Sequence, residues 1–131
     1  MRAAWIFAAV LGLDACQPDE TVSGHGGAET EWRLVTLDGA AFGARATLRF
    51  PEEGMMAGEG PCNTYRGTQS APYPWFDAGR ITTTRRACPD LDAEARFLDA
   101  LAEMTLVEVA ADTLILSTDS GREMVFRATD P

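Results

Sequence analysis

The sequence predicts a mainly β fold with one helix: a small antiparallel sheet of about eight strands, curved or barrel-like. Two observations support this. Short segments of alternating apolar and polar residues follow one another, separated by turn residues such as Asp38 and Gly39. Only one segment, residues 90–104, has helical periodicity, and strands and helices do not alternate along the chain. Antiparallel strands that curve around one helix account for both.

Before the helix, the expected strands cover residues 31–37, 46–50, 55–58, 62–67 and 80–87. Their side chains alternate between two faces, so one face of each strand points to the core. In the segment 62–67, Asn63 and Tyr65 share one face, and Thr64 and Arg66 share the other. Bulky residues on the inward faces should fill the interior of the barrel rather than leave it hollow: Leu34, Leu48, Phe50, Leu116 and Phe126.

The helix begins near Pro89 and Asp90, and acidic residues in its first turns favour its N-terminus. Its apolar residues recur at helical spacing: Leu91, Phe97, Leu98, Leu101 and Met104. Three strands at 106–109, 114–117 and 124–127 then form a terminal meander. The residues expected to face inward are Val107 and Val109 (or Leu106 in a slipped register), Leu114, Leu116, Met124 and Phe126.

The N-terminus reads as an export signal. Arg2 precedes an apolar run over residues 3–13, which has the length of a secretory signal and is too short to span a bilayer. Residues 13–16, Leu-Asp-Ala-Cys, resemble a lipobox, in which Cys16 is lipidated and becomes the first mature residue. We therefore expect residues 1–16 to be a lipoprotein signal peptide; an ordinary signal peptide that is cut elsewhere is the alternative.

Residues 17–30 hold no apolar periodicity and are expected to form a flexible linker, with a reach of about 20 Å and a solvated His25. The domain would then occupy residues 31–131. By analogy with enterobacterial sorting, Gln17 after the anchor predicts an outer-membrane lipoprotein that faces the periplasm. The expected partners are the membrane, through the lipid anchor, and an unidentified envelope protein or lipid.

Charge and composition restrict the function further. The formal net charge is −9, and all 11 basic residues are arginines, which disfavours nucleic acid as a partner. The single histidine, His25, rules out a Ser-His-Asp triad in the domain, and no glycine-rich phosphate loop is present. Neither a metal nor a cofactor is expected, and the chain is predicted to be a monomer without enzymatic activity.

Two cysteines remain once Cys16 is assigned to the anchor. An even number of exported cysteines makes a disulfide between Cys62 and Cys88 the first expectation, and the pair would hold the helix against the sheet. Two buried free thiols remain an alternative. A zinc site lacks ligands, a redox pair lacks the CxxC spacing, and a nucleophilic cysteine lacks a histidine.

The segments around these cysteines carry a family resemblance. Residues 58–67 (GEGPCNTYRG), residues 84–89 (TRRACP) and the amphipathic stretch up to Met104 resemble the META domain, which is typified by small heat-inducible bacterial lipoproteins. The resemblance implies a curved barrel with lipocalin-like topology and one helix, but no agreed activity. It also marks four polar residues with structural or binding roles, among which Glu94 is expected to pair with an inward-turned Arg85 or Arg86: Asn63, Tyr65, Arg85 and Glu94.

One loop carries three aromatic residues that either form a contact patch or fold back over the core: Tyr73, Trp75 and Phe76. Function is expected to be that of a non-enzymatic envelope lipoprotein that supports outer-membrane integrity or the stress response. This expectation rests on analogy at the level of the fold. The alternatives are a barrel that binds a small hydrophobic ligand, and an inhibitor or interaction module for an envelope enzyme.

Overall fold

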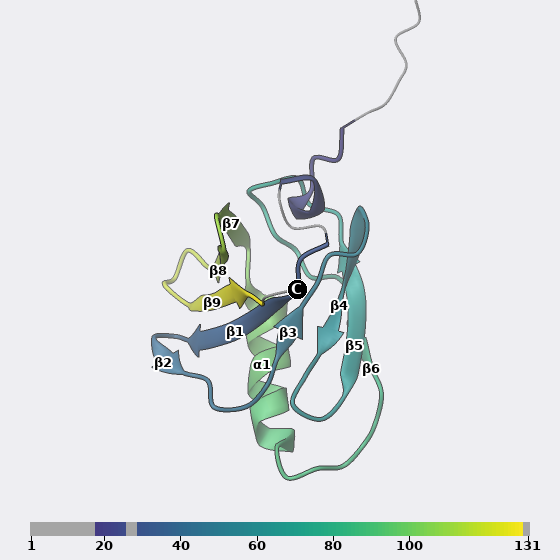
Figure 1. Ribbon diagram of the computed structural model, residues 1–131, viewed down its shortest axis with the longest axis vertical. Helices are drawn as coiled ribbons and strands as arrows, with labels where there is room; N and C mark the ends of the chain where they lie inside the picture. Colours follow the sequence, from purple (N-terminus) through teal and green to yellow (C-terminus); the bar gives the residue numbers. More distant parts are fainter. Residues whose placement is uncertain (1–17, 26–28, 130–131) are drawn as a thin grey trace, which may run out of the picture.

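The computed structural model describes residues 18–25 and 29–129. In these residues nine strands form two antiparallel sheets around one helix, α1 (Leu91–Glu103) (Figure 1). The larger sheet has the order β2-β1-β9-β8-β7, with β3 also paired to β1: β1 (Trp32–Leu37), β2 (Ala40–Ala41), β3 (Thr47–Leu48), β7 (Leu106–Ala110), β8 (Thr113–Ser117) and β9 (Glu123–Ala128). The smaller sheet consists of β4 (Gly54–Glu59), β5 (Thr64–Gln69) and β6 (Thr82–Thr83). The predicted class, mainly β with one helix, is confirmed.

The two sheets are joined without closing into a continuous barrel. On one side, Arg49 and Ala57 exchange two backbone hydrogen bonds of 2.7 and 2.9 Å, which link β3 to β4. On the other side, the segment before β6 hydrogen-bonds to β7 through Pro74 and then to β5 through Gly79. The expected closure of the strands on themselves is therefore corrected to two curved sheets, with α1 between them (Figure 1).

The core is filled by the residues that alternation assigned to it. Leu34 and Leu114 both lie opposite Phe126 in the register of the large sheet. All five predicted interior residues are at most 2% exposed. From the helix, Phe97, Leu101 and Met104 complete this core, whereas Leu91 in its first turn is 43% exposed. The interior thus contains packed side chains, as predicted.

The strands differ from the prediction at two places. β2, which pairs with the end of β1, was not predicted, because two alanines carry no alternation signal. β6 is much shorter than the expected strand over residues 80–87. Beyond Thr84, the backbone of this segment is held by the side chain of Asn63, which bonds both the N–H and the C=O of Arg86. Side-chain bonds thus replace the strand ladder there.

The predicted flexible linker is wrong for residues 18–25. This segment contains a 3-10 helix, η1 (Val22–His25), and Val22 is 1% exposed and belongs to the core. His25 is exposed, as expected, but its ring stacks on Tyr73 with ring centroids 4.4 Å apart, and the backbone N–H of Tyr73 donates to the backbone oxygen of Glu20. Val22 is a single large apolar residue in a polar segment, so the sequence shows no periodicity from which this packing could be predicted. The expected signal peptide, Cys16 and Gln17 lie outside the described residues.

No helix in residues 18–25 and 29–129 has the length and apolar character needed to cross a membrane.

Candidate functional site

A buried carboxylate joins the helix to the start of β5. Glu94 is 6% exposed, and its carboxylate accepts three hydrogen bonds: from the backbone N–H of Cys62 at 3.0 Å, from the backbone N–H of Asn63 at 2.7 Å, and from the Asn63 side-chain amide at 2.7 Å. The side-chain oxygen of Asn63 in turn accepts from the hydroxyl of Thr84 at 2.9 Å. Each polar group in this cluster has a partner, as burial requires, so its role is structural.

The disulfide lies beside this cluster. Cys62 and Cys88 are bonded, with their Cα atoms 5.8 Å apart, and the bond connects the residue two before β5 to the turn that enters α1. The predicted pairing is confirmed, and the alternative of two free thiols is excluded. The bond and the Glu94 carboxylate act on the same corner of the fold, where the helix meets the small sheet.

The predicted arginine partner of Glu94 is wrong. Arg85 and Arg86 are both exposed, and neither makes an ion pair in the part of the chain that the structure describes. Backbone and amide N–H groups occupy the carboxylate instead. They satisfy a buried anion at a lower desolvation cost than a second buried charge would.

Tyr65 is a core residue with a polar tip. It is 4% exposed, its ring lies 5.6 Å from that of Phe97, and its hydroxyl donates to the backbone oxygen of Thr47 at 2.6 Å. Burial raises the pKa of Tyr65 well above its usual range, and the nearby charge of Arg49 opposes this rise. The hydroxyl therefore stays protonated and is committed to Thr47.

Two glycines before Cys62 allow this close packing. A Cβ at Gly58 would lie 2.2 Å from the backbone oxygen of Thr47, and one at Gly60 would lie 2.7 Å from the Glu94 carboxylate. A real side chain cannot approach that closely, so the two positions require glycine for space. This gives a physical reason for the Gly-Glu-Gly sequence.

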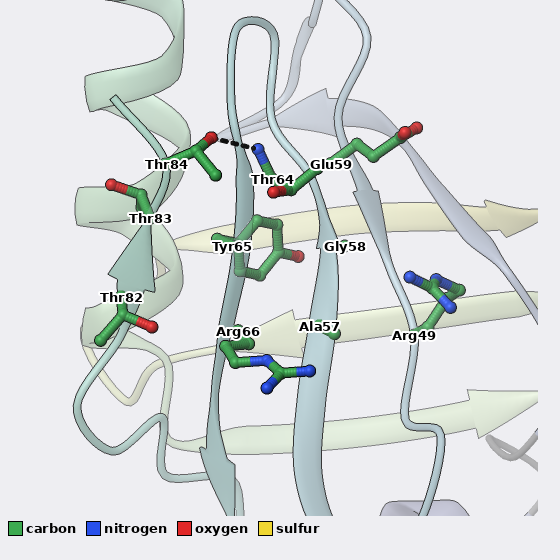
Figure 2. Close-up of a pocket in the computed structure, with 10 residues that line it drawn as sticks. All are labelled: Arg49, Ala57, Gly58, Glu59, Thr64, Tyr65, Arg66, Thr82, Thr83 and Thr84. Atoms are coloured by element: carbon green, nitrogen blue, oxygen red, sulfur yellow. Dashed lines mark hydrogen bonds between the residues drawn. The ribbon is translucent and has the colours of Figure 1, made fainter. Parts of the chain in front are cut away.

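An open groove crosses the outer face of the small sheet (Figure 2). It has a volume of about 460 Å³ and passes from β6 over β5 and β4 to Arg49. Figure 2 shows the guanidinium of Arg66 reaching from β5 toward β4, with Thr82, Thr83 and Thr84 along the opposite side. A second depression of about 350 Å³ shares Glu59, Thr64 and Thr84 with it and extends it: Arg45, Gly60, Pro61, Cys62, Asn63 and Arg86 line the rest. We call the first the arginine groove and the second its extension.

The arginine groove is positively charged. Its one acid, Glu59, pairs with Arg45 at 3.3 Å. Arg49 and Arg66 make no ion pair in the described residues. Two further acids, Glu29 and Glu31, line a shallow depression on the far side of Arg49 but lie beyond ion-pair distance of it. Two unpaired guanidinium groups thus face solvent across one small sheet.

Sequence reasoning did not find this groove, although part of the signal was present. The outward face of residues 62–67 carries Thr64 and Arg66, and the three consecutive threonines lie on the neighbouring strand β6 and directly after it. What the sequence did not reveal is that Arg49, from a different part of the chain, lies next to Ala57.

The aromatic loop does not form one patch. Phe76 is 2% exposed and packs in the core, with its ring edge-on to Phe50 at 6.5 Å. Tyr73 is half-buried, and its hydroxyl accepts a hydrogen bond from the backbone N–H of Val109 at 3.0 Å. Only Trp75 of the three is exposed, at 57%. Phe76 and Tyr73 thus follow the alternative in which the loop folds back over the core, and the contact patch is reduced to Trp75.

Comparison with known proteins places the fold and the family. The chain is similar to an NMR structure of a protein from Burkholderia xenovorans, with a TM-score of 0.64 and 23% identity over 97% of this chain and 100% of that chain. It also resembles a second NMR structure, with a TM-score of 0.58 and 19% identity over 75% of this chain and 87% of that chain. A third similar structure is the crystal structure of a DUF4847 family protein from Bacteroides vulgatus, with a TM-score of 0.54 and 17% identity over 65% of this chain and 59% of that chain.

At these identities the similar structures show the fold alone. No curated protein sequence matches the chain. The META domain model matches residues 25–131, which contain the disulfide, the Glu94 cluster and the arginine groove. The chain therefore belongs to the META domain family.

Proposed function

We propose that this protein is a non-enzymatic envelope lipoprotein that supports outer-membrane integrity under stress by binding a protein or lipid partner. The observation that carries the proposal is the disulfide between Cys62 and Cys88. Structural disulfides form and persist in exported proteins, because the cytosol keeps thiols reduced. The lipobox-like residues 13–16 supply the means of export and attachment.

The packed N-terminal segment changes how such an anchor would hold the domain. Pro18 is two residues after Cys16, so at most about 7 Å of extended chain separates the acylated residue from the first described one. Thr21, Val22 and Ser23 are buried against the domain. The domain would therefore sit at the lipid headgroups with a restricted orientation, rather than on the long tether that we first expected.

The filled core argues that the partner binds outside the domain. The interior between the sheets and the helix holds large side chains that are almost fully buried, including Trp32, Phe50 and Phe97. A lipocalin-like carrier needs a hollow interior for its ligand. The external arginine groove is the better candidate for contact with a partner.

The proposal is tested by following Cys16. Metabolic labelling with a clickable fatty acid should label the wild-type chain and leave Cys16→Ser unlabelled, and the labelled protein should fractionate with the outer membrane. A deletion strain should become more permeable to a hydrophobic dye after heat stress, and only the wild-type gene should restore the barrier. Labelling that is equal in both chains, or an unchanged barrier under every stress applied, would count against the proposal.

A further inference from the structure

We propose that the arginine groove binds a phosphate group, through Arg49, Arg66 and the free hydroxyl of Thr82 on β6. The source of the phosphate, a lipid headgroup or a free phosphate compound, depends on the proposed envelope location; the binding chemistry does not.

The first argument is the distribution of charge. The chain carries 20 acidic and 11 basic residues, so an average surface region should be acidic. The arginine groove and its extension are instead lined by four arginines and one acid: Arg45, Arg49, Arg66, Arg86 and Glu59. Arg45 lies within ion-pair distance of both Glu59 and Glu31, so the local positive field of the groove comes from the other three arginines.

The second argument is the supply of free hydrogen-bond donors. Arg66 and Arg49 are exposed and make no ion pair in the described residues, so their guanidinium groups remain available. Thr82 and Thr83 are exposed and their hydroxyls also lack a partner there. By contrast, Thr84 already binds Asn63 and the backbone N–H of Thr64. Of the two threonines, Thr82 pairs with Arg66 across the strands and shares its face of the sheet, whereas Figure 2 shows the Thr83 hydroxyl pointing away from the groove.

The third argument concerns the kind of ligand. Guanidinium groups pair with phosphate oxygens through two parallel hydrogen bonds, and hydroxyls add further donors to the same group. The lining side chains are mainly arginines and threonines, and Tyr65 is the one aromatic residue among them. A polar group with several acceptor oxygens uses these donors, whereas an acyl chain would leave them without partners.

The net charge of the whole protein restricts which phosphate-bearing compounds or surfaces can approach the groove. A charge of −9 repels an extended anionic surface, while the groove attracts an anion at close range, within about one Debye length. Glu29 and Glu31 on the far side of Arg49 add to the repulsion at that end. Arg66, farther from these acids in the lining, is therefore the residue on which binding should depend most.

The test uses protein purified from cells in dodecyl maltoside, which is uncharged. It is titrated with pyrophosphate, with dihexanoyl-phosphatidylglycerol and with zwitterionic dihexanoyl-phosphatidylcholine, and binding is followed by calorimetry and by the NMR signals of the arginine side chains. Saturable binding of pyrophosphate alone identifies a free phosphate compound as the source. Binding of phosphatidylglycerol in addition, without binding of phosphatidylcholine, identifies an anionic headgroup.

The variants separate the groove from general charge. Arg66→Ala should weaken binding at least about tenfold, and Arg66→Lys should weaken it less, because lysine keeps the charge but loses the bidentate geometry. Arg33→Ala is the matched control: it removes one exposed arginine of β1, and it should change the affinity less than about twofold. Both side chains are exposed, so far-UV circular dichroism should stay unchanged.

Two results would overturn the proposal. The first is that neither phosphate probe binds; if a glutamate decapeptide then binds through Arg66, the groove is a site for an acidic protein segment. The second is that Arg33→Ala weakens binding as much as Arg66→Ala does. Because the titration does not involve Cys16, a failure here leaves the acylation test unaffected, and a failure of acylation leaves this one intact.

Discussion

The carboxylate of Glu94 accepts two hydrogen bonds from one residue, Asn63, each 2.7 Å long. One comes from the backbone and one from the side chain, so the contact fixes both the position and the orientation of Asn63. Through this residue, the helix holds the start of β5, and the side chain of Asn63 then holds the segment around Arg86. The buried carboxylate of Glu94 therefore fixes the helix, the start of β5 and the segment around Arg86 relative to one another.

Replacing Glu94 with alanine should lower the free energy of unfolding by about 3 kcal/mol, because bonds to a charged acceptor contribute most and their donors would remain buried without partners. Glu94→Gln should cost less, since its amide oxygen still accepts from one of the donors. Chemical denaturation under oxidising conditions measures both changes. Glu108→Ala, which removes an exposed acid of β7, is the control and should change stability by less than about 0.5 kcal/mol. A loss of similar size in the control would contradict the assigned role of Glu94.

Removing the disulfide should also destabilise the domain. Cys62 and Cys88 are 26 residues apart, and closing a loop of that length stabilises a protein by about 3 kcal/mol on the chain-entropy model. The double substitution Cys62→Ser/Cys88→Ser should lower the denaturation midpoint accordingly. Adding reductant should then shift the wild-type midpoint toward that of the variant and leave the variant unchanged.

Gly58→Ala should be strongly destabilising, by about 2 kcal/mol or more, because the new methyl group would meet the backbone oxygen of Thr47 at 2.2 Å and the Tyr65 hydroxyl at 2.8 Å. Gly43→Ala offers a matched control, since nothing lies within 4 Å of a Cβ there. It should be neutral or slightly stabilising, as expected where alanine only restricts the unfolded chain. Thermal melts of both variants distinguish a steric effect from a general loss of glycine.

Trp75 and Phe76 are neighbours with opposite environments, at 57% and 2% exposure. Phe76→Ala should cost about 3–5 kcal/mol, in the range of other large-to-small changes in a core. Trp75→Ala should cost less than about 1 kcal/mol, since most of the ring is already in water. If the tryptophan variant proves the less stable of the two, the aromatic loop packs differently from the structure described above.

Acid should weaken the contact between Asp38 and Arg122. Hydrogen bonds from the Arg122 side chain, and one from the backbone of Glu123, hold the pKa of Asp38 below its usual value. A carboxyl group whose pKa is lower in the folded state stabilises the fold above its unfolded value of about 3.9, and this contribution is lost as the pH falls through the folded value. Asp38→Asn should therefore make the free energy of unfolding depend less steeply on pH below about pH 3.9, as measured by denaturation at a series of acid pH values.

Periodicity was enough to predict most of the fold. Alternation located the core faces of β1, β8 and β9, and helical spacing located α1. These predictions succeeded because the core residues are buried on account of their apolar side chains, which need no specific partner. Alternation also placed Asn63 and Tyr65 on one face of their strand, and the structure shows that this face is the buried one. The disulfide followed from the number of cysteines and from the expected compartment.

The interactions that depend on distant parts of the chain could not be predicted in this way. The partner of Glu94 was assigned as an arginine because opposite charges attract, yet backbone N–H groups take that place. The arginine groove depends on Arg49 lying beside β4, which is a consequence of sheet topology. The packing of Val22 rests on one apolar side chain in a polar segment, too little for any pattern to show.

The intact mass of the protein purified from outer membranes, measured before and after reduction and thiol alkylation, tests the lipid anchor and the disulfide together. We expect a chain that begins at an acylated Cys16, and whose Cys62 and Cys88 react with the alkylating agent only after reduction. A chain without acyl groups, with both thiols alkylated in the absence of reductant, would contradict this expectation.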